Sequence, residues 1–363
     1  MKLGIFTFHC AHNYGAVIQC YALQEYLKSL GHVVYVIDYR PTYLVNYYKK
    51  YKRCYWSEGK NRINSIFVES IRFLYREGRY KAFQSFINNR LQLYPYKIGD
   101  DFSDFDAILL GSDQIWNPDI TGKSFDPVFF GEGIACKKIA YAASNKNYTL
   151  THEEKDYYVK SLLNLDHIGV RESTLQHLLQ PLTEKKVYLN VDPTLLAGDI
   201  LFKDLDITQG FKHKYVLIYE ITSHKNVYEM AKKYALSNQY KLKELNSKII
   251  ETRLRERDQT ASPEKWIRYI KHAEMVVTTS FHGVAVSILL KNKFFYVRQN
   301  NPDDYRIESL LNQLNLQDRI IEPTEIISDT PIDYSSVNKN LELIRKDSEK
   351  YIAESLFANR DVN

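Results

Sequence analysis

Residues 275–290 read MVVTTSFHGVAVSILL and combine three patterns that few folds accommodate. An apolar, β-branched run comes first, a short polar turn follows, and small and apolar residues complete the stretch. This order predicts a buried strand that leads directly into a helix. The backbone N–H groups at such a helix start, together with the helix dipole, favour an anion. His282 in the turn places a titratable imidazole beside that anion site.

The start of the chain shows a related order of patterns. The predicted elements are a strand at 3–8, a helix at 16–30 and a strand at 33–38. Such a βαβ unit predicts a parallel sheet, in which ligands bind at the carboxyl ends of the strands. The loop from His9 to Gly15 is therefore expected at the rim of a cleft. His9 and His12 are too close together to complete a tetrahedral metal site, so we expect a polar loop and no metal.

Strand and helix patterns continue to alternate along the chain, which predicts two α/β domains. We expect the first domain at 1–205, the second at 206–330 and a C-terminal helical segment at 331–363 that returns to the first domain. Asp192-Pro193-Thr194 is expected to end the last strand of the first domain with a helix-breaking stop. The second domain is predicted to hold strands at 215–221, 240–245 and 294–297, and helices at 226–236, 263–273 and 304–314. No G-x-G-x-x-G fingerprint is present.

Polar residues follow two other predicted strands of the first domain. The strand at 105–110 ends in Gly-Ser-Asp-Gln-Ile-Trp-Asn-Pro, residues 111–118. A carboxylate, amides and an indole suit a carbohydrate site, although the same residues also suit a turn with a core tryptophan. Arg171 follows the strand at 168–170, where it is placed either to hold a carboxylate or phosphate or to pair with Glu172.

Charge is unevenly distributed along the chain. The net charge is +5, yet the segment from Arg40 to Arg90 alone holds twelve basic and three acidic residues. Within it, a basic and aromatic insertion at 43–93 is predicted to form helices at 63–77 and 80–91, the first with an apolar stripe that includes Ile66, Phe67, Ile71 and Leu74. Such a stripe either docks on the core or contacts a membrane surface. We expect residues 40–90 to face a negatively charged partner, a membrane surface rather than nucleic acid.

The remaining composition predicts a cytoplasmic protein. The four cysteines have no paired spacing, which favours a reducing compartment. The N-terminus reads as a first strand and not as a signal peptide. No apolar stretch approaches the roughly 20 residues that span a bilayer, so any membrane contact is expected to be peripheral, at the inner face.

Six motifs in this order resemble a known family: FHCAHNYGAVIQCYALQEYL, LLGSDQIWNP, IAYAAS, GVRES, VDPTLL and TTSFHGVAVSILL. The chain is similar, from residue 1 to about 314, to the bacterial polysaccharide pyruvyl transferases. The resemblance implies an α/β fold with two Rossmann-like domains that face each other across a cleft, similar to the GT-B glycosyltransferases. It also implies transfer of pyruvate from phosphoenolpyruvate to two hydroxyls of one sugar, which yields a pyruvate ketal and phosphate without a further cofactor. The acceptor is expected to be a lipid-linked sugar of exopolysaccharide or capsule biosynthesis.

The resemblance also implies roles for particular residues. His282 would be the catalytic acid or base, and Asp113 would steady the reacting carbon or take a hydroxyl proton. Arg171 would hold the anionic groups of the donor. The donor would also contact the start of the helix, at Ser280, Phe281 and Gly283. The acceptor would contact residues of two loops of the first domain, namely Asn13, Tyr14, Gln114, Trp116 and Asn117.

Two other functions are compatible with the same patterns. A GT-B glycosyltransferase that uses a nucleotide sugar usually holds the ribose with a carboxylate of the second domain, but no Asp or Glu occurs between Glu274 and Asp303. A non-catalytic carbohydrate-binding protein of the same pathway would need Trp116 and the tyrosines, but not Arg171 together with His282.

Overall fold

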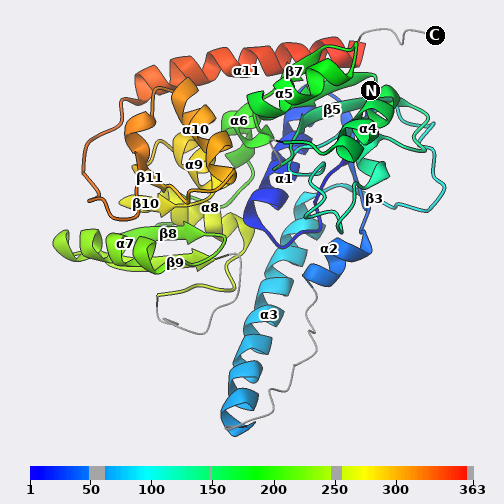
Figure 1. The fold of residues 1–363 in the computed structure, drawn as a ribbon. Helices are drawn as coiled ribbons and strands as arrows, with labels where there is room; N and C mark the ends of the chain where they lie inside the picture. Colours follow the sequence, from blue (N-terminus) through cyan, green and yellow to red (C-terminus); the bar gives the residue numbers. More distant parts are fainter. Residues whose placement is uncertain (49–61, 147–148, 247–255, 358–363) are drawn as a thin grey trace.

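The computed structural model describes residues 1–48, 62–146, 149–246 and 256–357, which form two parallel β-sheets covered by helices (Figure 1). The first sheet has the strand order β3-β2-β1-β4-β5-β6-β7. Its strands are β1 (Lys2–Phe6), β2 (Val33–Ile37), β3 (Leu93–Tyr94), β4 (Ala107–Leu110), β5 (Lys137–Ala143), β6 (His167–Val170) and β7 (Val187–Leu189). The helices of this domain are α1 (Tyr14–Ser29), α2 (Thr42–Tyr47), α3 (Arg62–Arg90), α4 (His152–Ser161), α5 (Ser173–Leu179) and α6 (Pro193–Ala197).

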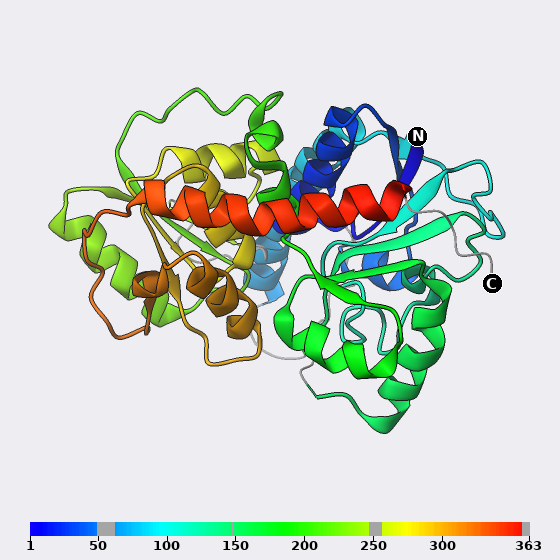
Figure 2. The same ribbon diagram turned by 90° about the horizontal axis from the view of Figure 1, so that it is seen from above.

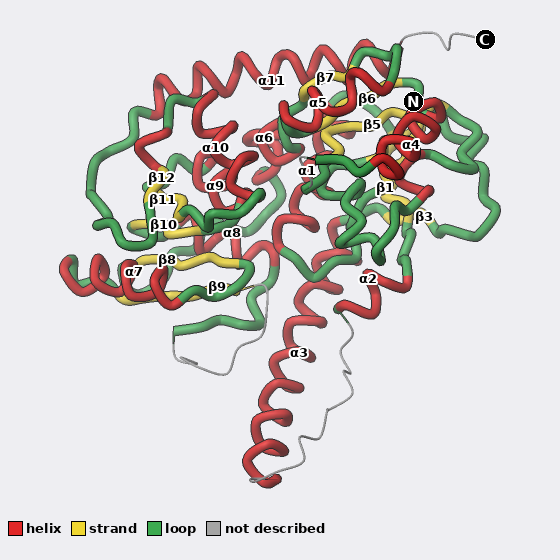
Figure 3. The backbone as a smooth tube through the Cα atoms, viewed as in Figure 1, coloured by secondary structure: helices red, strands yellow, loops and turns green. Residues whose placement is uncertain are grey.

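The second sheet has the order β12-β11-β10-β8-β9. Its strands are β8 (Tyr215–Glu220), β9 (Lys241–Asn246), β10 (Met275–Thr278), β11 (Phe294–Val297) and β12 (Ile320–Ile321). Its helices are α7 (Lys225–Ser237), α8 (Pro263–Lys271), α9 (Phe281–Leu289) and α10 (Asp303–Gln313), and α11 (Tyr334–Phe357) follows. The expected α/β fold with two Rossmann-like domains is confirmed, since neighbouring strands of both sheets pair in parallel. Figure 3 shows the strands in yellow among helices in red.

The order of the strands places a ligand crevice in each domain. In the first sheet, β1 lies between β2 and β4, and in the second sheet β8 lies between β9 and β10. Chain connections leave each sheet in opposite directions at these points, and ligands of open α/β sheets bind outside the carboxyl ends of the strands there. Residues after β1, β4 and β10 are therefore positioned for function.

The central strands are largely apolar, as expected for strands whose two faces are covered by helices. All residues of β4 (AILL) and β10 (MVVT) are buried. One apolar cluster continues from the first domain into the second and includes Leu23 of α1, Leu196 of α6 and Val284 of α9. The domains therefore share part of their core, which fixes the helix starts at their interface.

Helix α3 is a single helix of 29 residues, where the sequence predicted two helices at 63–77 and 80–91. Gly78 lies inside this helix, and a Cβ at this position would come within 2.8 Å of Thr260 in the second domain. The glycine therefore permits close packing and does not end the helix. The helix projects from the body of the molecule (Figure 1). The side chains of 62–72, with most of the predicted apolar stripe, and all of 49–61 lie outside the described residues.

Asp192-Pro193-Thr194 begins helix α6, whereas the sequence predicted a helix-breaking stop at these residues. Asp192 is the N-cap and accepts a hydrogen bond from the Thr194 backbone N–H, while Pro193 occupies the first turn. Proline is favourable at this position because its missing N–H would have no helical partner.

Helix α11 lies across both domains (Figure 2). Near its start, the Tyr334 hydroxyl donates to the carbonyl of Asn292 in the second domain. Near its end, the Tyr351 hydroxyl donates to the carbonyl of Ala140 in the first domain at 2.7 Å. Among the described helices, none is both long and apolar enough to span a bilayer.

Candidate active site

Three helices begin at one place between the domains. Asn13 caps α1, Asp192 caps α6 and Ser280 precedes α9. The Asn13 and Asp192 side chains accept hydrogen bonds from the N–H groups of their helices, whereas the Ser280 side chain makes no capping bond. The start of α9 is therefore the one of the three whose backbone N–H groups are not capped by a side chain, as an anion site requires.

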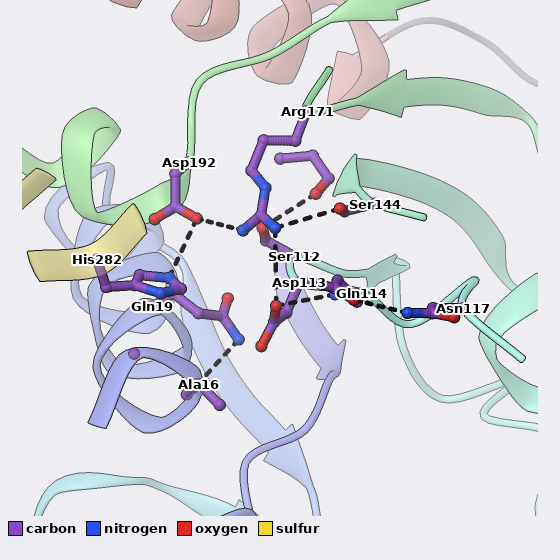
Figure 4. A network of polar contacts seen from close by, with 12 residues as sticks. Ala16, Gln19, Ser112, Asp113, Gln114, Asn117, Ser144, Arg171, Asp192 and His282 are labelled. Atoms are coloured by element: carbon purple, nitrogen blue, oxygen red, sulfur yellow. Dashed lines mark hydrogen bonds and ion pairs between the residues drawn. The ribbon is translucent and has the colours of Figure 1, made fainter. Parts of the chain in front are cut away.

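His282 lies at this helix start, against the first domain. Its side chain packs on Gly15 so closely that a Cβ at residue 15 would be 2.1 Å from the His282 Nδ1. The His282 Nε2 lies 3.5 Å from Asp192 Oδ2 (Figure 4). His282 is 8% exposed. The histidine that the sequence singled out thus lies at the domain interface beside a carboxylate, where it can exchange a proton with a bound substrate.

Asp192 uses its two carboxylate oxygens for different purposes. Oδ1 accepts from the Thr194 N–H at 3.0 Å and from its hydroxyl at 2.8 Å, which anchors the carboxylate to α6. Oδ2 accepts from Arg171 Nη1 at 2.8 Å and faces His282. Burial alone would raise the pKa of Asp192, but the charges and hydrogen bonds of His282, Arg171 and the helix start hold that pKa well below its usual range. Asp192 is therefore ionised at neutral pH.

Arg171 lies among three carboxylates and its side chain is 2% exposed. Besides Asp192, its guanidinium contacts Glu172 Oε1 at 3.2 Å and Asp113 Oδ1 at 3.7 Å. It also donates to Ser144 Oγ at 3.2 Å (Figure 4). The Phe281 ring centre lies 4.9 Å from the Arg171 Cζ. The pairing with Glu172 that the sequence left open is present. Because these carboxylates balance its charge, Arg171 cannot supply the whole positive charge that a polyanionic donor needs.

Glu172 is a buried carboxylate whose charged form is disfavoured by its surroundings. Burial raises its pKa in spite of the nearby charge of Arg171. Its Oε1 accepts from the Ser144 hydroxyl at 2.6 Å, but its Oε2 is buried without a hydrogen bond. Burial therefore disfavours the charged form of Glu172, and the charge of Arg171 acts in the opposite direction.

Asp113 follows β4 and is the most accessible of the three carboxylates. Its side chain is 17% exposed, against 2% for Glu172 and 0% for Asp192. Its backbone has a φ of 81°, a left-handed conformation that aspartate tolerates better than most residues. Among the three, Asp113 is the carboxylate that a substrate can reach.

Gln114 and Asn117 lie beside Asp113. Their side-chain amides are 2.7 Å apart (Figure 4). The end of the Gln114 side chain also meets Arg306 of α10 in the second domain, with its oxygen 2.6 Å from Nη1 when the amide is oriented to accept. A guanidinium only donates hydrogen bonds, which requires that orientation. Asn117 Oδ1 accepts from the Asp119 backbone N–H at 3.0 Å, so it also holds the turn.

Trp116 corrects the sequence expectation of an acceptor contact. It is 0% exposed, its indole N–H donates to the Phe129 carbonyl at 2.9 Å, and its ring stacks on Phe130. A side chain enclosed in this way has no face for a sugar. Trp116 is therefore a core tryptophan, which is the alternative that the sequence also allowed.

Tyr14 requires the same correction. Its ring is fully buried and stacks on Trp266 of the second domain, with ring centres 5.5 Å apart. Its hydroxyl donates to the Ala261 carbonyl at 3.0 Å. Tyr14 therefore joins the domains and does not line a sugar site, whereas its neighbour Asn13 lies at the helix start as its cap.

The residues around His282 support the helix start. Ser280 donates its backbone N–H to Thr278 Oγ1 at 3.1 Å, and the ring of Phe281 packs under Arg171. Gly283 is needed because a Cβ there would lie 2.4 Å from the Thr278 hydroxyl. These three residues shape the site; their contact with a donor stays a prediction.

The loop that carries His9 and His12 has no metal-site geometry. His9 Nε2 lies 2.8 Å from Asp38 Oδ1, and the His12 ring stacks on Phe83. Burial lowers the pKa of His12 to about 4, with the charges of Arg79 and Arg40 acting in the same direction. Within the described part of the chain, no three His, Cys, Asp or Glu side chains gather as metal ligands would.

The sequence reasoning missed three residues of this site, Ser144, Asp192 and Arg306, and left the pairing of Glu172 with Arg171 open. Asp192 had a usable signal, because Asp before Pro is a helix N-cap pattern. Arg306 also had one, since it shares a helix face with Ser309 and Gln313 three and seven positions further on. Ser144 only becomes a partner of Arg171 once β5 and β6 lie side by side.

Solved structures with a similar fold include UDP-GlcNAc 2-epimerases. The enzyme from Neisseria meningitidis bound to UDP-GlcNAc has 12% identity and a TM-score of 0.48, with 99% of this chain and 95% of that chain covered. The enzyme from Methanocaldococcus jannaschii has 10% identity and a TM-score of 0.46, with 95% and 93% covered. A putative enzyme of this type from Listeria monocytogenes has 10% identity and a TM-score of 0.48, with 99% and 91% covered. At such low identity the likeness says nothing about activity.

No curated protein matches the sequence. The family model of the polysaccharide pyruvyl transferases, in contrast, matches residues 13–301. This range includes the start of α1, the strand ends that carry Asp113 and Arg171, the N-cap Asp192, and His282. The chain therefore belongs to the polysaccharide pyruvyl transferase family.

Proposed function

We propose that this protein transfers pyruvate from phosphoenolpyruvate to two hydroxyls of one sugar and releases phosphate. The observation that carries the proposal is His282, held at an uncapped helix start over Gly15 and beside the ionised Asp192. The helix start suits an anionic donor, and the imidazole can move a proton. Membership of the family supports the same reaction class.

The chemistry needs two additions at one carbon. In the first, a sugar hydroxyl attacks C2 of phosphoenolpyruvate while C3 takes up a proton and becomes a methyl group. In the second, another hydroxyl of the sugar replaces the phosphate at C2, and the ketal forms. Both hydroxyls lose their protons, one proton ends on C3, and the other leaves with phosphate.

The described residues divide these tasks. We assign proton transfer at the donor to His282, because an imidazolium formed there is balanced by the Asp192 carboxylate. We assign the hydroxyl proton of the acceptor to Asp113, the carboxylate that solvent reaches. Arg171 holds Asp192 and Asp113 in place and adds a positive charge near C2 substituents. Asn13, Gln114 and Asn117 remain the proposed acceptor contacts.

The test is phosphate release and product mass. Wild-type protein, incubated with phosphoenolpyruvate and candidate lipid-linked sugars, is expected to release phosphate and to add pyruvate to one sugar, as seen by mass spectrometry. His282→Ala should fold but lose roughly 100-fold or more of that rate, the scale of general acid–base catalysis. His213→Ala, at an exposed position of the second domain, is the matched control. Near-wild-type turnover by His282→Ala would refute the assignment.

We also propose that the protein works at the cytoplasmic face of the membrane, where a lipid-linked acceptor would be found. The support is the basic charge of residues 40–90 together with exposed apolar side chains on α2 and α3, such as Tyr47 and the 67% exposed Leu74. Anionic vesicles should therefore sediment the protein at low salt, and less of it at high salt, because salt screens the attraction. Failure to sediment at low salt would contradict this.

A further inference from the structure

A small cavity lies between the domains and beneath α11. Its volume is about 100 Å³. It therefore has room for a group larger than one water, which occupies roughly 30 Å³ in the liquid. All three parts of the molecule line it: Arg171, Asn190 and Asp192 of the first domain, Phe281, Arg306 and Gln313 of the second, and Asp347 of α11. The cavity shares Arg171 and Asp192 with the candidate active site, so an occupant would touch the same network as His282.

Asn190 points to an occupant. The residue is 2% exposed, and both the oxygen and the nitrogen of its side-chain amide are buried without a hydrogen bond. The position is fixed, because the Asn190 backbone N–H donates to the Val170 carbonyl at 2.7 Å and the side chain packs over Gly169. A Cβ at residue 169 would lie 1.9 Å from the Asn190 Oδ1. Buried amides normally find partners, so this amide is best explained by a polar ligand.

Arg306 supplies positive charge at the same cavity. It comes from α10, and Ser309 and Gln313 of the same helix also line the space. These residues are three and seven positions apart, which places them on one helix face. The Arg306 guanidinium reaches Gln114 across the domain interface and is near enough to act on the charge of Glu172.

The other charged lining groups do not oppose an anion strongly. Arg171 and Asp192 are bonded to each other at 2.8 Å and largely cancel at a distance. Asp347 is exposed at the rim of the cavity, so water and salt screen its charge. Arg306 and the Asn190 amide are then the groups that select the occupant. A guanidinium fork and an amide N–H suit a phosphate or a carboxylate.

We propose that this cavity is an oxyanion subsite, in which Arg306 and Asn190 bind the phosphate group of the donor. The inference rests on the proposed function, since it takes phosphoenolpyruvate to be that donor. In this proposal Arg306 supplies positive charge to the anionic donor, which Arg171 cannot do alone because carboxylates surround it. The donor would join α10 to the first domain when it binds, with Arg306 as the binding residue and His282 as the catalytic one.

Calorimetric titration of the full chain tests this subsite, with inorganic phosphate and phosphoenolpyruvate as separate probes. Arg306→Ala is expected to weaken binding of both by about tenfold or more, the scale of a lost charge-assisted hydrogen bond pair. Asn190→Asp, which keeps the shape and adds a negative charge, should weaken both as well. Arg298→Ala is the matched control, because Arg298 is an arginine of the same domain that pairs with Glu308 and Glu322 at the surface. Circular dichroism checks that each variant is folded.

Kinetics separate this inference from the proposed function. If both hold, Arg306→Ala raises the KM for phosphoenolpyruvate more than it lowers kcat, because it loses binding and not proton transfer. Wild-type binding of both probes by Arg306→Ala would overturn the subsite while leaving the reaction intact. Loss of phosphate binding with unchanged phosphoenolpyruvate binding would overturn the donor assignment and indicate a separate phosphate site. Arg306-dependent binding of both probes without any ketal product would support the subsite and refute the proposed function.

Discussion

At the scale of single residues, the candidate site depends on how one carboxylate is shared. Asp192 fixes the start of α6 with one oxygen and meets Arg171 and His282 with the other. The residue therefore couples the fold to the chemistry. Its charge has to be present for both, which gives a pH dependence that can be measured.

Stability should fall at acid pH in a way that depends on Asp192. The folded-state pKa of Asp192 is depressed, so its stabilisation is fully present above the ordinary aspartate pKa of about 3.9 and is lost as pH falls through that value toward the folded pKa. Its size is on the order of 2 kcal/mol. Urea unfolding at about pH 6 and about pH 3 should show a larger loss for wild type than for Asp192→Asn. Equal losses would show that the pKa of Asp192 is not lowered in the folded protein.

Gly15 is expected to be as important for activity as the charged residues. Because a Cβ would overlap the His282 ring, Gly15→Ala must displace the imidazole or helix α1. We expect a loss of about 1–3 kcal/mol in stability, typical of overpacking, and a larger relative loss of kcat. Gly210→Ala is the control, since a Cβ there would lie 3.6 Å from His272 in ordinary contact. Phosphate release and urea unfolding give the two readouts, and wild-type kcat in Gly15→Ala would exclude the observed His282 position from catalysis.

Sequence reasoning found the individual groups of the site more easily than their partners. His282, Asp113 and Arg171 each follow a strand, and the parallel sheets bring these strand ends to the domain interface as expected. The sequence could not show that Asp192 and Asp113 also contact Arg171, because these contacts span 21 and 58 positions and depend on strand order. It also could not distinguish a buried Trp116 from an exposed one, since a core indole and a sugar platform have the same local pattern.

At the scale of helices and strands, α11 connects the two domains by polar bonds as well as apolar packing. Ser348 Oγ accepts from the Val191 backbone N–H at 2.9 Å, and Arg345 Nε donates to the Leu195 carbonyl at 2.8 Å. Both partners flank Asp192 in sequence. The helix therefore supports the segment that positions the shared carboxylate.

Tyr351→Phe should loosen this support without opening a cavity. The variant loses the hydroxyl bond to the Ala140 carbonyl in a fully buried setting and keeps the ring. We expect the free energy of unfolding to fall by about 1 kcal/mol. Tyr240→Phe in the second domain is the control, as no hydrogen bond of its hydroxyl is found among the described residues. A loss no greater than that of Tyr240→Phe, measured by urea unfolding, would contradict a structural role for the bond.

The elements themselves were largely predictable because apolar periodicity dominates them. Strand β11 was predicted at its observed bounds, and the helix after β1 was predicted within two residues at each end. A helix after β10 was predicted without bounds, and α9 is that helix. The errors arose at residues whose usual local preference is to end a helix but which here lie inside a helix or begin one. Gly78 reads as a break in sequence but fits against Thr260, and Pro193 reads as a stop but begins a helix.

At the scale of the whole molecule, the candidate site is built by both domains, so a donor bound there should stabilise the native state as a unit. A ligand that binds only the native protein adds about 2.7 kcal/mol at a concentration 100 times its Kd. Phosphoenolpyruvate at saturation is therefore expected to raise the unfolding temperature by a few degrees. Uridine diphosphate should leave it unchanged, because the proposed donor site accommodates a small acid and not a nucleotide.

The two ligands distinguish the proposed reaction from sugar-nucleotide chemistry on the same architecture. The His282→Ala variant should still be stabilised by phosphoenolpyruvate, because the imidazole moves a proton and the helix start and Arg306 bind the anion. Stabilisation by phosphoenolpyruvate that persists in His282→Ala while phosphate release is lost would separate binding from catalysis within one molecule. The opposite pattern, in which uridine diphosphate stabilises the protein and phosphoenolpyruvate does not, would favour a glycosyltransferase and remove the basis for a pyruvyl donor.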